Sequence, residues 1–115
     1  MKEVLKDILE IDGVNGVVIL TDEGKIIFKE MSSTTTIKLD KVDWNLIIDA
    51  ILGYREIELI YENGMLYVRK IEFGFMMVLV DVYVQVAMIR LNCDIILPSL
   101  KNLKSNKNYK YLFKK

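Results

Sequence analysis

The segment REIELIYENGMLYVRKI, residues 55–71, limits the possible folds more than any other part of the sequence. Polar and apolar residues alternate over residues 56–62, and a period of two is typical of a strand with one buried face. Asn63 and Gly64 follow, and a type I′ turn needs positive φ at both central positions, which Asn and Gly adopt most readily. We therefore predict an antiparallel hairpin whose second strand covers residues 65–71.

The remaining sequence predicts three helices and three further strands around this hairpin. Short β-branched runs between turn residues are typical of strands, and apolar side chains at helical spacing are typical of amphipathic helices. Strands joined by short hairpins form an antiparallel sheet, and helices must cover its faces to bury the apolar runs. We predict an α+β fold of order αββαβββα, a five-stranded antiparallel sheet with helices on both faces. The expected helices are 2–11, 41–52 and 84–97, and the expected strands are 16–21, 25–31, 56–62, 65–71 and 75–82.

Local residues indicate where the second helix begins and ends and where the third is disturbed. Asp40 is expected to cap the helix at 41–52, with Asp43 near its positive end, and Gly53 is expected to stop it. Pro98 is expected to kink or break the last helix, because a proline inside a helix loses a backbone hydrogen bond and clashes with the preceding turn.

The helix at 41–52 has apolar side chains on two sides. One side should pack on the sheet, whereas the second has no obvious partner inside so small a domain. Exposed apolar patches of this kind usually mark an interface. The first side consists of Trp44, Ile47, Ile48, Ile51 and Leu52, and the second of Leu46 and Ala50.

The sequence contains no histidine, and this excludes much of the usual catalytic chemistry. Nucleophile–histidine pairs and histidine-ligated zinc or iron are ruled out, and a single cysteine makes a structural zinc site unexpected. The six glycines never occur at the spacings GxxxxGK[ST] or GxGxxG of phosphate-binding loops. We therefore expect no enzymatic activity, no catalytic residues, no metal site and no cofactor.

The side chains that retain some reactivity have structural explanations. Asp22 and Glu23 stand with Gly24 in a hairpin turn, and Asp81 follows a buried strand and is a candidate cap for the next helix. Asp94 is the remaining carboxylate that could take part in acid-base chemistry. Cys93 lies in an apolar helical pattern and is expected to be buried. The methionines expected to fill gaps in the core are Met76, Met77 and Met88.

The composition and the pattern of apolar residues predict that the protein is cytoplasmic. A lone cysteine points to a reducing compartment. The N-terminal residues mix charged and apolar side chains, unlike a signal peptide. The longest apolar run, residues 75–80, is far shorter than the roughly 20 residues of a membrane helix.

The order of these segments resembles the roadblock/dynein light chain domain family, in particular its small MglB-type members from bacteria and archaea. The most specific parts are GVNGVVILTDEGKII at residues 13–27 and a closing helix in which Met88, Ile89 and Leu91 match the family's apolar run. The resemblance covers residues 4–97. We therefore expect a roadblock-like domain at residues 1–100.

The resemblance implies a longin-like fold, dimers, and work as a partner of Ras-like small GTPases or as an adaptor in a larger complex. In dimers of this family the third strand pairs with its copy and the second helices pack above that seam; here these are residues 56–62 and 41–52. MglB-type dimers stimulate GTP hydrolysis without supplying a catalytic arginine. This sequence departs from the pattern in its short N-terminal helix and lysine-rich tail.

A symmetric dimer would also cover the spare face of the second helix and the edge of the third strand. In one register Leu59 faces its copy, and Glu56 then lies opposite Glu62, which is unfavourable for like charges. The face with these glutamates should remain exposed to solvent, or the two strands should pair in a different register. Packing of Trp44 and of the third strand's apolar row in the chain's own core is the alternative. The expected interface residues are Trp44, Leu46, Ile47, Ala50, Ile57, Glu58, Leu59, Ile60 and Tyr61.

The C-terminal segment, residues 101–115, differs in charge from the rest of the chain. It has six lysines and no acidic residue, which leaves residues 1–100 with ten basic and sixteen acidic residues. This tail is expected to be a helical extension or disordered. Aromatic residues among the lysines could dock on the acidic body, an acidic GTPase, an anionic membrane or RNA; we favour a protein, with no nucleic acid and no membrane insertion. The expected contact residues are Lys107, Lys110, Tyr111 and Phe113.

Three functions are compatible with these features. The leading one is a non-catalytic homodimeric regulator or scaffold that binds a Ras-like small GTPase and could stimulate its GTP hydrolysis. The second is a structural dimerisation or adaptor module of a motility, polarity or signalling complex with no effect on nucleotide turnover. The third is a sensor with a small-ligand pocket between sheet and helix, for which the sequence offers no converging polar groups.

Overall fold

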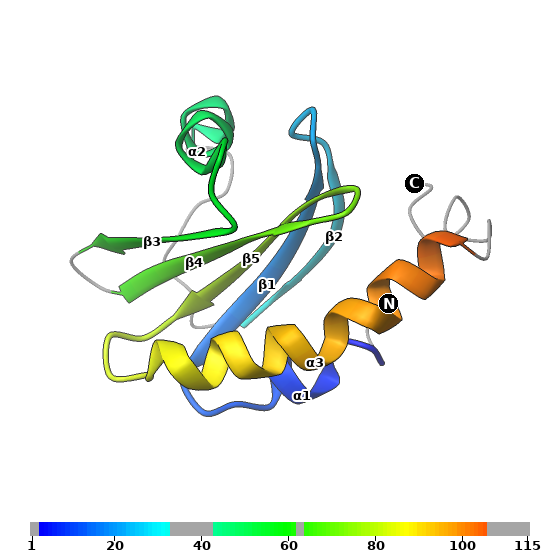
Figure 1. Ribbon diagram of the computed structural model, residues 1–115. Helices are drawn as coiled ribbons and strands as arrows, with labels where there is room; N and C mark the ends of the chain where they lie inside the picture. Colours follow the sequence, from blue (N-terminus) through cyan, green and yellow to red (C-terminus); the bar gives the residue numbers. More distant parts are fainter. Residues whose placement is uncertain (1–2, 33–42, 62–63, 106–115) are drawn as a thin grey trace.

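The computed structural model describes residues 3–32, 43–61 and 64–105 and confirms the predicted fold (Figure 1). Eight elements follow one another in the order αββαβββα. Their bounds are α1 Lys6–Leu9, β1 Val14–Thr21, β2 Ile26–Met31, α2 Trp44–Ile51, β3 Glu56–Tyr61, β4 Gly64–Ile71, β5 Gly74–Val80 and α3 Val86–Ser105.

The five strands form one antiparallel sheet in the order β2-β1-β5-β4-β3. Strand β5 inserts between β1 and β4 and is buried along its whole length. The two edges of the sheet are β2 and β3.

Helices cover both faces of the sheet, as predicted. Figure 1 shows α1 and α3 together on one face and α2 on the other, next to β3. The α3 side of the core includes Ile8, Ile19, Tyr67, Met76, Ile89 and Cys93. The α2 side includes Val18, Ile47, Ile51, Val68, Phe75 and Met77. The predicted burial of Met76, Met77 and Cys93 is thus confirmed.

The second helix begins later than predicted. Asp43 is its N-cap, and its carboxylate accepts a hydrogen bond from the backbone N–H of Leu46 at 3.1 Å. The proposed cap Asp40 lies outside the described residues. Gly53 ends the helix as predicted, with φ of +84°. Leu52, expected on the buried side, is exposed instead, because the helix has ended at Ile51 and the chain turns away.

The two predicted turns differ in outcome. The Asp22–Gly24 turn joins β1 to β2 as expected, and the backbone N–H of Gly24 donates to the carbonyl of Thr21 at 2.9 Å. The placement of Gly64 in the second turn is wrong, since Gly64 is the first residue of β4 and pairs with Tyr61. Residues 62–63, which connect the two strands, lie outside the described residues.

The last helix is longer than predicted. It continues through Pro98 to Ser105, so the proline does not break it, although α3 bends in its C-terminal half (Figure 1). Asp81 does not cap it, because α3 begins at Val86 and Asp81 instead accepts a hydrogen bond from the Asn15 amide at 2.9 Å. Among the described residues, α3 and the other helices are too short or too polar to cross a bilayer.

Candidate functional site

The outer edge of β3 has unpaired backbone groups among the described residues. Lys70 N–H donates to the Arg55 carbonyl at 2.9 Å, which marks residues 55 and 70 as a hydrogen-bonded pair of the β3–β4 ladder. Such pairs alternate along an antiparallel ladder, so every second residue of β3 directs its backbone away from β4. In the described strand these residues are Glu56, Glu58 and Ile60.

Apolar side chains lie along this open edge. Ile60 is 78% exposed and Leu59 is 36% exposed, and Leu46 and Ala50 on the neighbouring α2 are also exposed. Because side chains alternate across a strand, Leu59 lies on the α2 face and Ile60 on the α3 face. Exposed apolar side chains thus lie on both faces of the sheet at the β3 edge, and on the outer side of α2, which contacts β3.

The other residues predicted for this surface have different positions. Ile47 is buried and Ile57 half-buried, and both pack in the core beneath α2. Glu58 is exposed on the α3 face of the strand. The side chains of Trp44 and Tyr61 lie outside what the structure describes. Leu52 and Tyr54, which follow α2 in the chain, are also exposed apolar residues, and neither was predicted for this surface.

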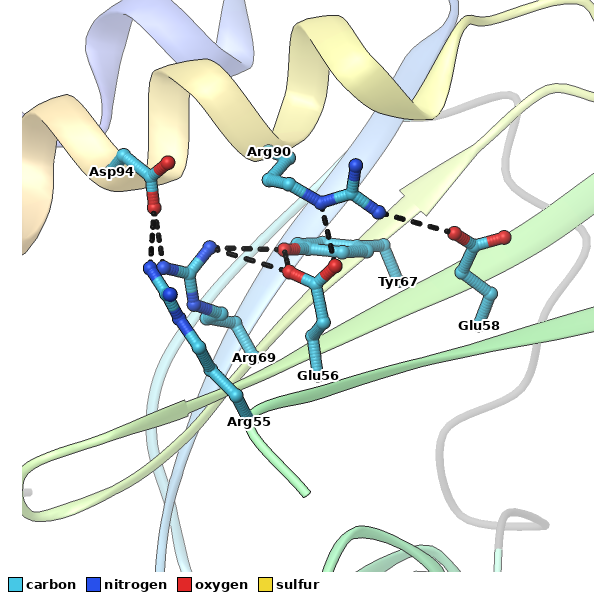
Figure 2. A network of polar contacts seen from close by, with 7 residues as sticks. All are labelled: Arg55, Glu56, Glu58, Tyr67, Arg69, Arg90 and Asp94. Carbon is cyan, nitrogen blue, oxygen red and sulfur yellow. Dashed lines mark hydrogen bonds and ion pairs between the residues drawn. The ribbon is translucent and has the colours of Figure 1, made fainter.

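A polar network ties β3 and β4 to α3 (Figure 2). Its centre is Arg69 on β4, whose side chain is only 1% exposed. Arg69 Nη2 donates to Asp94 of α3, and Nη1 lies 3.1 Å from the Tyr67 hydroxyl and 3.5 Å from the Glu56 carboxylate. A buried guanidinium needs such partners, because an unpaired buried charge is costly. Arg55, which is 73% exposed, approaches the same Asp94 oxygen at 3.3 Å.

A second arginine of α3 completes the network. Arg90 Nε lies 2.5 Å from the Glu56 carboxylate, and its Nη2 lies 3.7 Å from that of Glu58. The Tyr67 hydroxyl donates to Glu56 at 2.6 Å. The two acidic side chains of β3 are thus paired within their own chain. Sequence reasoning missed this network; the only local signal was the i, i+4 spacing of Arg90 and Asp94, which places them on one side of α3.

The network shifts the ionisation of its members. Burial raises the pKa of Glu56, but the hydrogen bonds from Tyr67 and Arg90 and the charges of both arginines outweigh it, so its pKa lies below the ordinary value. The hydrogen bond from Arg69 lowers the pKa of Asp94 more than burial raises it. Burial and the hydrogen bond to Glu56 raise the pKa of Tyr67 to about 12, which keeps its hydroxyl protonated as a donor.

The remaining candidate groups do not gather into a catalytic site. Asp22 pairs with Lys70 at 2.7 Å, whereas Asp81 bonds to Asn15 at the other end of β1. Burial raises the pKa of the Cys93 thiol to about 12, which disfavours the reactive thiolate. No group of three or more acidic or cysteine side chains in the described part of the chain could hold a metal ion. The predicted contact residues of the tail, Lys107, Lys110, Tyr111 and Phe113, lie outside it.

Comparison with known proteins gives matches in structure alone. No family model matches the sequence, and no curated protein matches it either. The fold is similar to a solved structure described as MglB with tetrameric arrangement, with a TM-score of 0.74 at 14% identity over 90% of this chain and 87% of that one. The gliding protein MglB from Thermus thermophilus gives 0.66 at 15% identity over the same shares.

A Roadblock/LC7 domain from Streptomyces avermitilis extends the similarity beyond the MglB proteins. Its TM-score is 0.64 at 11% identity, over 91% of this chain and 94% of that one. Identities this low carry information on the fold rather than on partners. The resemblance of the sequence is thereby confirmed at the level of structure, and the chain has the fold of the roadblock domains.

Proposed function

We propose that this protein is a non-catalytic, cytoplasmic homodimer that regulates or scaffolds a Ras-like small GTPase. The observation that carries the dimer is the open β3 edge beside the exposed apolar side of α2. The proposal of a GTPase partner is supported by the MglB-type resemblance of the sequence and by the two MglB structures with a similar fold. The chain's own lack of histidine suits a protein that acts by binding.

The proposed seam is an antiparallel pair of β3 strands around a twofold axis at Leu59. The outward N–H and C=O groups of Glu58 in one copy then form hydrogen bonds with those of Ile60 in the other copy. An axis at Glu58 would set this carboxylate directly against its copy, and like charges in that position are destabilising. The Leu59 register avoids this contact and places two leucines together on the α2 side.

The same register sets Glu56 opposite Glu62, which argued against a close dimer from the sequence. In the structure the Glu56 carboxylate lies 2.5 Å from Arg90 Nε and 3.5 Å from Arg69 Nη1. Its charge is therefore largely compensated by its own chain. This compensation reduces the repulsion across the axis and supports the Leu59 register.

Light scattering and GTPase assays on the full chain test the two parts of the proposal separately. We expect a mass of at least two chains at micromolar concentration, and a strict monomer at high concentration would overturn the dimer. Purified Ras-like GTPases of the source organism are then titrated with the protein in their GDP and GTP forms. Selective binding to one form supports the GTPase partnership, and no binding to any of them overturns it.

Hydrolysis measurements separate a regulator from a scaffold. The rate of GTP hydrolysis by the bound GTPase is measured over a range of protein concentrations. Acceleration identifies an activator. Binding without acceleration identifies the adaptor function.

A further inference from the structure

Arg90 on α3 reaches two carboxylates of β3 with one guanidinium (Figure 2). Its Nε lies 2.5 Å from Glu56 Oε1, and its Nη2 lies 3.7 Å from Glu58 Oε1. Glu56 and Glu58 are two residues apart on the strand, so their side chains lie on the same face of the sheet. The planar fork of an arginine can span two acceptors in this way, whereas a lysine has a single charged centre. Arg90 therefore connects α3 to the charged face of the β3 edge.

The two glutamates depend on Arg90 to different degrees. Glu56 has a second cation nearby, since its carboxylate lies 3.5 Å from Arg69 Nη1. In the part of the chain that the structure describes, Arg90 is the only cationic side chain within 4 Å of the Glu58 carboxylate. Glu58 is also one residue from the proposed twofold axis at Leu59. Without Arg90, an uncompensated negative charge would lie beside that axis in each copy.

We propose that Arg90 is a positioning residue of the β3 seam, which holds and compensates Glu58 so that two β3 strands can approach each other. This role rests on the proposed dimer and names a charge on which its affinity depends. In the Leu59 register Glu58 of one copy lies opposite Ile60 of the other, so the two Glu58 side chains are diagonal neighbours on one face. Diagonal neighbours in an antiparallel pair lie about 7–8 Å apart. Two uncompensated carboxylates at this separation repel each other and weaken the seam.

The separation of the two glutamates sets the size of the effect. Repulsion between unit charges about 8 Å apart raises a dissociation constant about 2-fold in water and about 30-fold at an effective dielectric constant of about 20. The Glu58 side chain is 38% exposed, which places it between these limits. Loss of Arg90 should therefore raise the dissociation constant of the dimer about 10-fold in low salt. The fold itself should change little, because exposed ion pairs contribute little to stability and Arg90 is 44% exposed.

Ultracentrifugation of the full chain at two salt concentrations tests this role. The dissociation constants of the wild type and of Arg90→Ala are compared at about 10 mM and about 1 M salt, between which the Debye length falls from about 30 Å to about 3 Å. In low salt the variant should dimerise about 10-fold more weakly than the wild type. In high salt the ratio of the two constants should approach about 1, because screening removes the repulsion between the glutamates. Salt would not repair a seam that is weakened by altered folding in this way.

Two further variants identify the charge on which Arg90 acts. Adding Glu58→Gln to Arg90→Ala removes the uncompensated carboxylate, so the double variant should dimerise like the wild type in low salt. Arg55→Ala is the matched control, because it removes an arginine that pairs with Asp94 and not with Glu58. It changes the net charge by the same amount and should leave the dissociation constant unchanged at both salt concentrations. Thermal unfolding should show that all three variants remain folded.

Two results would overturn the role of Arg90 while the dimer stands. One is a dimeric wild type whose dissociation constant is unchanged by Arg90→Ala in low salt. The other is a weakening that neither salt nor Glu58→Gln relieves, which would mean that Arg90 supports the shape of the edge and not its charge balance. A wild type that stays monomeric at high concentration would overturn the proposed dimer and this role together, so the two failures can be told apart.

Discussion

The two edges of the sheet are held to the molecule in different ways. The β2 edge has a buried residue, Ile27, and a half-buried Phe28 that pack on the α3 side of the core. In β3, residues 56–60 include no fully buried side chain, and ion pairs to α3 supplement the half-buried Ile57. One edge strand is thus part of the apolar core, whereas the other is a lightly packed strand secured by charges.

The two edge strands also differ in the residues whose backbone groups face outward. Ser32 N–H donates to the Asn15 carbonyl at 2.7 Å, so the alternation of the ladder directs the backbone of Lys29 outward on β2. An exposed lysine is a common protection against pairing at a sheet edge. On β3 a residue with an outward backbone is Ile60, whose apolar side chain is 78% exposed. The comparison favours β3 over β2 as the edge for the proposed seam.

The largest expected effect is the loss of the buried arginine that secures the β3 side. Arg69→Ala should lower the free energy of unfolding by about 3 kcal/mol, because it removes the buried partner of two carboxylates and leaves a void. Arg55→Ala is the matched control: Arg55 approaches the same Asp94 but is 73% exposed. It should cost less than about 0.5 kcal/mol. Urea unfolding of both variants measures the difference.

Equal losses for the two arginine variants would contradict this assignment. Arg69→Lys sharpens it further, because lysine keeps the charge but not the planar fork that reaches Tyr67, Glu56 and Asp94 together. A lysine variant as stable as the wild type would mean that charge alone, without this geometry, holds β3 to α3.

Proline substitutions compare the two edges directly. Ile60→Pro removes an outward N–H of β3, and in a symmetric seam two such hydrogen bonds are lost. At about 1 kcal/mol for each, the dimer dissociation constant should rise about 30-fold. Lys29→Pro removes an outward N–H of β2 and should leave the dissociation constant unchanged. Both substitutions leave the described ladder of the chain intact, so the two monomers should keep similar stability.

Ultracentrifugation of the two proline variants measures the dissociation constants. A dimer that is weakened by Lys29→Pro and unaffected by Ile60→Pro would mean that the seam forms at β2 and not at β3. Equal weakening by both would mean that the loss comes from altered folding and not from the seam.

The sequence predicted the sheet far better than the surface. Strand alternation and turn residues are local signals, and they indicated all five strands and the helices on both faces. The polar network could not be predicted in this way, because it joins Glu56, Arg69 and Asp94 from three separate elements. Leu52 was misplaced because α2 ends one residue earlier than predicted, so Leu52 does not take a helical position. Met88 was assigned to the core by residue type, but it is 42% exposed, on the same side of α3 as the exposed Leu91 and Ile95.

Acid should weaken the β3 side before the β2 side. The pKa values of Glu56 and Asp94 lie below their ordinary values of 4.5 and 3.8, so the native state binds these protons less readily than the unfolded chain. Their stabilisation is complete above those ordinary values and is lost as the pH falls through the lowered ones. Hydrogen exchange followed from pH 6 to pH 3, about where carboxylates titrate, should show lost protection in β3 while β1 and β2 stay protected.

Neutral variants provide the control for the acid effect. Glu56→Gln with Asp94→Asn should be less stable than the wild type at neutral pH and should lose less on acidification. The effect should be smaller than that of Arg69→Ala, because both carboxylates are partly exposed. Unchanged acid sensitivity in this double variant would assign the pH dependence to other groups.

The smallest expected effect concerns the helix beside the β3 edge. Asp43→Ala removes the carboxylate that accepts the N–H of Leu46 and should cost about 1 kcal/mol of α2 stability, whereas Asp43→Asn keeps an acceptor and should cost little. Since α2 contacts β3 and forms part of the proposed seam, the alanine variant should also weaken the dimer severalfold. Hydrogen exchange of α2 and the dissociation constant measure the two effects. If α2 frays and the dimer is unaffected, the exposed side of α2 lies outside the seam, and the dimer rests on the β3 ladder alone.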